Sequence, residues 1–276
     1  MFSANRQFVV KHAALALALV IVSTSVLNAE SALSTDDIRE PYLYLLQASK
    51  HGDTTVCHGT GVFIYPYSSN DTLCLMTAHH NLRDRDKLEL FHQGPNGTLE
   101  AVLDSAIDLN DNAGNPLFRT FQTDSTEVAD FALLSFPKSC ISTKRLRSLS
   151  RSFCLFGDSI KAGDHVVVFG FPELATFSFV RRGDFMAVSA TVAYVDEAAN
   201  AYLLDRKLHH GMSGGIVYKE LPLDGCYGYK AAGLVLMRYQ PYPDYSVIVN
   251  LNYIDSIYVR ETGSPWGQPS TDTGEH

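Results

Sequence analysis

The sequence comprises 276 residues, of which 46% are hydrophobic and 19% are charged, and its formal net charge is −8. This composition is typical of a globular protein with a sizeable core and excludes a disordered or fibrous chain. Because the balance is acidic and no stripe of clustered Lys and Arg is present, nucleic acid is not expected as a partner.

The N-terminal segment differs from the rest of the chain. Arg6 and Lys11 precede an apolar run over residues 13–27, and Ala29 supplies a small residue at a plausible cleavage site. This layout is typical of a secretory signal peptide, so we expect residues 1–29 to be removed and the protein to be exported to the extracellular space or the periplasm. The alternative is an uncleaved membrane anchor, since the run approaches the length of a short spanning helix. Polar residues at 23–25 argue against it, and membrane contact is expected only if the segment remains attached.

The region that follows consists mainly of predicted strands. Residues 36–48 are mixed and polar, with some helical character, and precede them. The later apolar runs are rich in Val, Ile, Leu and aromatic residues and are separated by Gly, Asn, Asp and Pro, which predicts strands rather than helices. They cover residues 59–66, 72–79, 87–92, 131–136, 165–171, 186–195, 215–218, 231–239 and 245–251. Many short strands at this spacing predict an all-β sandwich or barrel, and the chain is long enough for two small barrels.

The end of the chain changes character again. Tyr253–Arg260 is periodic and predicts a short terminal helix. Residues 261–276 are rich in Gly, Pro, Ser and Thr, so we expect a disordered tail there. One domain is therefore expected over residues 30–260.

The five cysteines do not form the close pairs of a zinc or redox site, so we expect no metal at them. In an oxidising compartment their expected use is in disulfides. Cys57 with Cys74 is one candidate pair, Cys140 with Cys154 is a second, and Cys226 would then be unpaired. The alternative is that all five are reduced and packed in the interior.

Three segments carry residue types that together suggest hydrolysis. They are TAHH, which ends at His80, ADFALL, which contains Asp130, and GMSGG, which contains Ser213. Small residues around a serine let the backbone turn sharply and direct the N–H groups of Gly211 and Ser213 outward, where they could stabilise an oxyanion. Taken singly, each segment has an ordinary explanation, as a glycine-rich turn, a core histidine or a solvated strand start. The order His, Asp, Ser along the chain favours the functional interpretation, because chymotrypsin-like barrels have it.

These segments resemble the TAAH, DxALL and GxSGG stretches of the trypsin-like serine peptidases. The resemblance implies that Ser213 is the nucleophile, His80 its general base and Asp130 the residue that supports the charged imidazole, with no cofactor. It implies an oxyanion hole made by the N–H groups of Gly211 and Ser213. It also implies two packed antiparallel six-stranded β-barrels with a short C-terminal helix, divided near residues 140–160. The segments at 59–64, 163–172 and 231–236 resemble further strands of the family.

The chain also departs from the digestive trypsins. Met212 replaces the aspartate that pairs with their new N-terminus, so activation by that ion pair is not expected and the resemblance is closer to bacterial members without a C-terminal peptide-binding domain. His79 replaces a small residue. Lys207 stands six residues before the nucleophile, where trypsins have an aspartate, which argues against basic P1 side chains. Arg238, on the expected cleft strand, favours acidic or small ones.

The sequence therefore predicts an exported serine endopeptidase that acts on proteins or peptides. Two histidine pairs, at 79–80 and 209–210, would lie near the cleft, but neighbouring side chains of a strand point to opposite faces, so we expect no metal site. The alternative function is a catalytically weak or inactive protein of the same fold that binds peptides or proteins, which His79 favours. A non-proteolytic esterase would more often have the order Ser, Asp, His.

Overall fold

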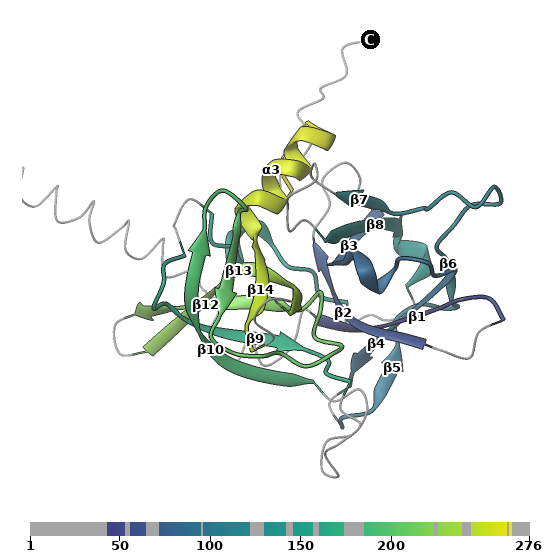
Figure 1. The fold of residues 1–276 in the computed structure, drawn as a ribbon. Helices are drawn as coiled ribbons and strands as arrows, with labels where there is room; N and C mark the ends of the chain where they lie inside the picture. The colour runs from purple at the N-terminus through teal and green to yellow at the C-terminus, as the bar shows by residue number, and fades with distance from the viewer. Residues whose placement is uncertain are drawn as a thin grey trace, which may run out of the picture.

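The structure is a computed structural model with two β-rich units placed side by side (Figure 1). The residues that it describes are 43–52, 56–64, 72–94, 96–121, 130–141, 146–156, 160–173, 185–223, 226–238, 244–263 and 265–266. The expected signal peptide lies outside these ranges, as does most of the expected tail. No helix within them is both long and apolar enough to cross a membrane.

The N-terminal unit is an antiparallel sheet of eight strands with the order β5-β4-β1-β2-β3-β8-β7, in which β6 also pairs with β4. Its strands are β1 (Leu43–Ser49), β2 (Val56–Ile64), β3 (Thr72–Ala78), β4 (Lys87–Gln93), β5 (Leu99–Ala101), β6 (Ile107–Asp108), β7 (Arg119–Phe121) and β8 (Phe131–Pro137). This unit corresponds to the first of the two barrels expected from the sequence. Within the described residues the sheet does not close, and its edge strands β5 and β7 have only three residues each.

The C-terminal unit is a closed barrel of six strands, as expected, with the order β10-β11-β14-β13-β12-β9. Its strands are β9 (His165–Gly170), β10 (Met186–Asp196), β11 (Ala201–Leu204), β12 (Ile216–Leu223), β13 (Cys226–Arg238) and β14 (Ser246–Asn250). The connection between the units carries two short 3-10 helices, η2 (Lys138–Cys140) and η3 (Arg151–Phe153). The all-β class with one short C-terminal helix is confirmed.

The longer strands β1, β2, β3 and β8 of the N-terminal unit are buried on both faces over most of their length. In β1, Leu43 and Leu45 belong to a hydrophobic cluster between the two units, whereas Tyr44, Leu46 and Ala48 belong to the interior of the sheet. Strands β3 and β8 alternate in the same way. Because both faces are covered, β2, β3 and β8 appear in the sequence as continuous apolar runs, which is why they could be recognised.

The first strand, β1, and four short strands, β5, β6, β7 and β11, were not recognised. The helical character expected for residues 36–48 is wrong from Leu43 onward, where β1 begins. Four consecutive buried residues, Leu43–Leu46, form an apolar run, and such a run does not by itself distinguish a buried strand from a helix. Strand β11, with four residues, was missed because its apolar run is so short.

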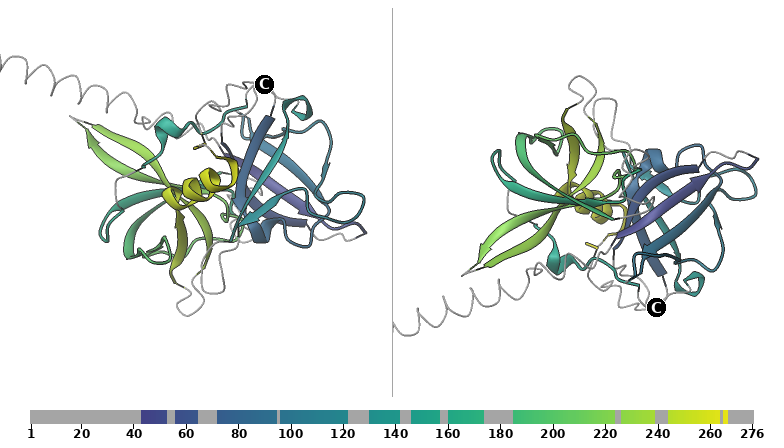
Figure 2. Two further views of the ribbon diagram at one scale, coloured as in Figure 1. Left: turned by 90° about the horizontal axis from the view of Figure 1, so that it is seen from above. Right: turned by 90° about the horizontal axis from the view of Figure 1, so that it is seen from below.

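A terminal helix and a tryptophan complete the contact between the units. Helix α3 (Leu251–Thr262) begins at the Asn250 cap, ends at Gly263 in the left-handed conformation, and lies against the barrel on the side of the N-terminal sheet (Figure 2). Its Ile254 and Ile257 enter the cluster between the units, together with Trp266, which is 0% exposed. The buried position of Trp266 shows that ordered packing extends beyond the expected end of the domain at residue 260.

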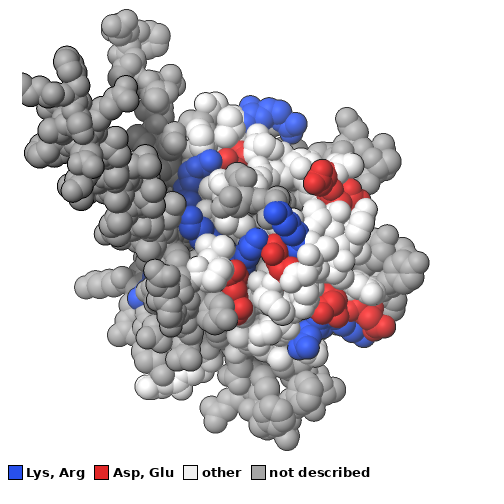
Figure 3. All heavy atoms as spheres, turned by 90° about the vertical axis from the view of Figure 1, so that its left-hand side faces the viewer, with Lys and Arg blue, Asp and Glu red and all other residues white. Residues whose placement is uncertain are grey.

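The molecular face on the left of Figure 1 carries charges of both signs. Figure 3 shows Lys and Arg beside Asp and Glu on the described part of this face, without a broad field of one sign. Among the described residues, opposite charges also pair directly, as Lys219 Nζ does with Asp164 Oδ2 at 2.8 Å. Nucleic acids bind mainly through basic side chains on their phosphates. That nucleic acid is not a partner stays a prediction.

The two disulfides suggested by the sequence are not formed. Cys57, Cys74, Cys140 and Cys154 are free thiols, and the side chain of Cys226 lies outside the described part. In the register of β2 and β3, Cys74 lies opposite Ile64, whereas Cys57 is seven residues away along β2 and lies opposite Ala48 of β1. Cysteines so far apart along neighbouring strands cannot be joined. Cys140 and Cys154 pack against different hydrophobic clusters.

We expect the cysteines to differ in reactivity under native conditions. Burial raises the pKa of Cys74 to about 12 and raises the pKa of Cys154 well above its usual value, so neither forms a reactive thiolate in the folded protein. Both should react only through unfolding, about 10³-fold more slowly than in denaturant. Cys57 and Cys140 are half-buried and should react in the native state.

Alkylation followed by peptide mass mapping measures this difference. Native and urea-unfolded samples are compared without reductant. If Cys74 or Cys154 stayed unlabelled in urea, the absence of a disulfide there would be contradicted.

Candidate active site

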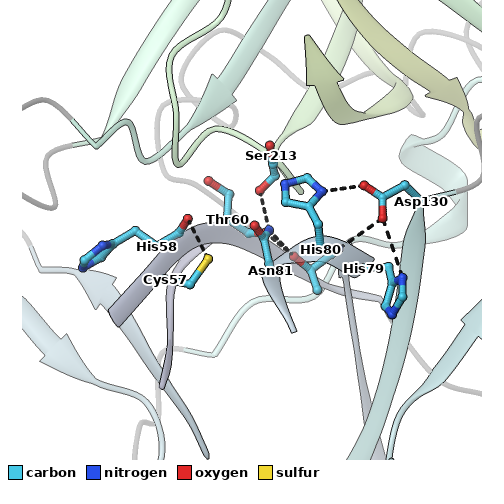
Figure 4. A network of polar contacts seen from close by, with 9 residues as sticks. Cys57, His58, Thr60, His79, His80, Asn81, Asp130 and Ser213 are labelled. Carbon is cyan, nitrogen blue, oxygen red and sulfur yellow. Dashed lines mark hydrogen bonds and ion pairs between the residues drawn. The ribbon is translucent and has the colours of Figure 1, made fainter. Parts of the chain in front are cut away.

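The three residues singled out by the sequence lie together where the two units meet (Figure 4). His80 lies in the 3-10 helix η1 (His79–Asn81), directly after β3, and Asp130 directly precedes β8. Strands β3 and β8 are antiparallel neighbours with Ala78 opposite Phe131, so the end of one strand meets the start of the other. This register brings His80 and Asp130 together although 50 residues separate them.

The imidazole of His80 is held by the carboxylate of Asp130. His80 Nδ1 lies 2.5 Å from Asp130 Oδ2, and the backbone N–H of His80 donates to Asp130 Oδ1 at 3.1 Å. The N–H of His79 donates to the backbone carbonyl of Asp130 at 2.8 Å. A neutral imidazole that donates from Nδ1 has Nε2 as its acceptor. The carboxylate therefore orients a ring whose second nitrogen can accept a proton.

Ser213 comes from the other unit, in the loop between β11 and β12. Figure 4 shows it beside His80, on the side of the ring away from Asp130. The loop turns at Gly211 and Gly214, each with φ of +85°. A Cβ on Gly214 would overlap the carbonyl oxygen of Thr60 in the N-terminal sheet. Glycine is thus required there both by the backbone conformation and by the close approach of the two units.

Two backbone N–H groups of this loop differ from their neighbours in their hydrogen bonding. The N–H groups of Met212, Gly214 and Gly215 donate to carbonyl oxygens at 3.3, 2.7 and 2.9 Å. Those of Gly211 and Ser213 have no acceptor among the residues that the structure describes. Unpaired N–H groups that converge beside a serine can bind the oxygen of a polarised carbonyl.

A buried polar network beneath the loop was missed by the sequence analysis. Its side chains are Thr60, Thr77 and Asn81, each at most 1% exposed. The N–H of Thr60 donates to the carbonyl of Ser213 at 2.8 Å, and Thr60 Oγ1 donates to the carbonyl of Gly211 at 2.8 Å. The one signal in the sequence is position, since Thr60 lies in the GTG segment and Asn81 directly follows His80.

The residues expected near the substrate pocket occupy different environments. Lys207 is exposed, while the next residue, Leu208, is buried and its N–H donates to Ser246 Oγ at 2.9 Å. Arg238 ends β13, where it pairs with Ser246, and its side chain lies outside the described part. Met212 is 0% exposed and packs in the hydrophobic core of the barrel, so apolar contacts surround its side chain.

The ring of His79 is largely buried and lies near the carboxylate of Asp130. Its Nδ1 lies 3.7 Å from Asp130 Oδ1, its side chain is 12% exposed, and the ring centroid lies 6.1 Å from that of Phe118. Burial lowers the pKa of His79, and the nearby carboxylate of Asp130 opposes this effect in part. Among the described residues, no three His, Cys, Asp or Glu side chains are grouped so that they could hold a metal ion.

Comparison with known proteins identifies the family. The family model described as "Trypsin-like peptidase domain" matches residues 59–221. The chain belongs to this family. The match spans the η1 histidines, Asp130 and the Ser213 loop. A search of curated protein sequences found no match.

Several solved structures are similar to the peptidase domain. An inactivated protease paralogue from the scabies mite has 14% identity and a TM-score of 0.52, with 81% of this chain and 95% of that chain covered. The active form of a protease from M. tuberculosis has 15% identity and a TM-score of 0.48, with 86% and 90% covered. A serine endoprotease from Yersinia pestis has 14% identity and a TM-score of 0.49, with 87% and 67% covered. At such identities the likeness to the scabies mite protein shows the fold alone.

The pKa of His79 predicts how its replacement changes acid stability. Burial lowers this pKa in the folded state below the usual 6.5, so the unfolded state binds a proton more readily and stability is lost as the pH falls below about 6.5. In His79→Gln this loss is absent. Between about pH 7.5 and pH 5 the melting temperature of the variant should therefore fall less than that of the wild type. An equal fall of the melting temperature in both proteins over this pH range would contradict this prediction.

Proposed function

We propose that this peptidase domain is an active serine endopeptidase with Ser213 as nucleophile, His80 as general base and Asp130 as the residue that orients the base. The observation that carries the proposal is the contact of 2.5 Å between His80 Nδ1 and Asp130 Oδ2, with Ser213 on the other side of the ring (Figure 4). A carboxylate that orients a base, with a serine hydroxyl beside that base, supplies the parts that nucleophilic acyl transfer requires.

The chemistry follows from the positions of these groups. His80 Nε2 takes the proton of Ser213 Oγ while that oxygen attacks the carbonyl carbon of a peptide bond. The oxygen of the tetrahedral intermediate receives hydrogen bonds from the N–H groups of Gly211 and Ser213. His80 then gives its proton to the leaving amine, and an acyl-enzyme remains. Water, activated by the same histidine, attacks the ester carbonyl and releases Ser213.

Asp130 contributes by fixing the imidazole rather than by accepting its proton. It receives hydrogen bonds from the ring and from the backbone N–H of His80, so the ring and the peptide of the base are held by one carboxylate. An amide in its place could donate to Nδ1 and so favour the wrong tautomer. In triads of this kind the loss is about 10⁴-fold in kcat.

The substrates are proteins or peptides, and the preference for a P1 side chain is a prediction. An acidic or small P1 side chain was expected from Lys207 and Arg238. Lys207 is exposed, so any contact with substrate would be solvated and weak. Export to the extracellular space or the periplasm is likewise proposed, on the composition of residues 1–29 alone.

The competing function is a peptide- or protein-binding module without catalysis. The feature that favours it is His79, whose Nδ1 lies 3.7 Å from the carboxylate that also holds His80. A second imidazole at Asp130 could draw the carboxylate away from the base. The N–H groups of Gly211 and Ser213 favour the enzyme, because no acceptor among the described residues occupies them and an oxyanion could therefore bind there.

Covalent labelling distinguishes the two functions. A fluorophosphonate reagent should modify Ser213 at neutral pH, and the adduct should be located by peptide mass mapping. Ser213→Ala should remove the labelling, while Asp130→Asn should slow it by about 10⁴-fold, because that replacement favours the wrong tautomer of His80. A folded wild-type protein that is not labelled would exclude the proposed enzyme and favour the binding module.

A further inference from the structure

Asn81 connects the base of the proposed active site to its nucleophile. It directly follows His80 in η1, and its Nδ2 donates to the backbone carbonyl of Ser213 at 3.0 Å, across 132 residues of sequence (Figure 4). The same Nδ2 donates to Thr77 Oγ1 at 3.1 Å. A backbone carbonyl can only accept, so the amide must present its nitrogen to Ser213.

The position of this amide is fixed by packing as well as by hydrogen bonds. Asn81 is 1% exposed, and a Cβ on Gly59 of β2 would overlap its side chain. Thr77 Oγ1, which accepts from Asn81, donates in turn to the carbonyl of Thr60 at 2.7 Å. Asn81 therefore lies in a fitted space in the N-terminal unit, from which it reaches the loop of the other unit.

The peptide between Ser213 and Gly214 is held from both ends. Its carbonyl accepts from Thr60 N at 2.8 Å and from Asn81 Nδ2, both in the N-terminal unit. Its N–H donates to the carbonyl of Val235 in the barrel at 2.7 Å. The distance between Ser213 and His80 depends on how the two units are docked, and directional hydrogen bonds between the units restrict that docking.

We propose that Asn81 is a positioning residue that sets the placement of Ser213 relative to His80 by anchoring the carbonyl of the nucleophile to the turn that carries the base. The proposal rests on the proposed function, since it assigns a role within that active site. Asn81 touches no reacting atom. Its effect is on the geometry in which the proton of Ser213 reaches His80, and on the direction of the free N–H of Ser213.

The structure offers a variant that removes this anchor with little other damage. In Asn81→Leu the shape is nearly kept and the donor is lost. The Ser213 carbonyl still accepts from Thr60 N, and Thr77 Oγ1 still donates to the Thr60 carbonyl, so no buried polar group is left unpaired. Asn81→Ser, which is smaller and too short to reach the loop, serves as a second variant if the leucine does not fold.

A matched control is available in the same unit. Asn110 Nδ2 also bridges two acceptors, the Arg85 carbonyl at 3.1 Å and Asp86 Oδ1 at 3.2 Å. These partners lie outside the Ser213 loop. Asn110→Leu should thus lower stability by a similar mechanism and leave the loop unchanged.

The experiment measures fluorophosphonate labelling, kcat and KM on a peptide substrate, and amide hydrogen exchange in peptides that cover residues 208–217. For Asn81→Leu we expect the labelling rate and kcat to fall roughly ten- to a hundredfold, with KM within about twofold, because small misplacements of reacting groups have effects of this size. Exchange in the loop should become faster. Asn110→Leu should match the wild type in all three, per folded molecule.

The outcomes separate the two proposals. If the wild type is labelled and Asn81→Leu is unchanged in labelling rate and in loop exchange, the role of Asn81 is overturned while the enzyme stands. If the wild type is not labelled but loop exchange rises in Asn81→Leu, the anchor stands and the proposed enzyme fails. A loss of labelling in Asn81→Leu and Asn110→Leu alike would show a general loss of stability and would also overturn the role of Asn81.

Discussion

The contact between Thr60 and the Ser213 loop is the interaction on which the proposed active site depends. Thr60 lies in the N-terminal sheet, yet its N–H and its hydroxyl both donate to carbonyls of a loop in the barrel. It also accepts from the N–H of Phe171 at 2.9 Å. Since the proposed base and nucleophile belong to different units, the hydrogen bonds of Thr60 to the loop decide whether the two residues lie close together. Buried hydrogen bonds of this kind are costly to leave unmade, so they favour one docking geometry over others.

Hydrophobic packing stabilises the contact between the two units, and the hydrogen bonds of Thr60 to the Ser213 loop fix its geometry. The longer strands of the N-terminal sheet are buried on both faces, one toward the interior of the sheet and one toward the barrel. Helix α3 and Trp266 add to the hydrophobic cluster between the two units. Apolar contacts are not directional and would tolerate small shifts between the units. The hydrogen bonds to the Ser213 loop are directional, so an error in docking would break them. The site therefore uses the two kinds of interaction for different purposes.

The pair His80 and Asp130 has a simpler origin, in the register of β3 and β8. Antiparallel pairing places the end of one strand beside the start of the next, so residues just beyond Ala78 and just before Phe131 are neighbours. His79 shares in this geometry and adds a second imidazole to the carboxylate. In a partly buried position such a ring stays neutral near pH 7, so it adds a dipole rather than a charge. This explains how a bulky residue can occupy that place beside the proposed base.

The sequence alone predicted the residues of the proposed active site and the all-β class, because the three motifs are local patterns and most of the long strands are continuous apolar runs. It did not determine the strand at Leu43–Ser49, whose run of buried residues is equally compatible with a helix, nor the closure of the sheets. The absence of a bond between Cys57 and Cys74 follows from strand register, which places the two residues far apart along their strands. The role of Asn81 depends on a contact over 132 residues with a backbone carbonyl. No pattern in the sequence encodes such a contact, because any residue type supplies the same carbonyl and only the docking of the two units decides which donor faces it.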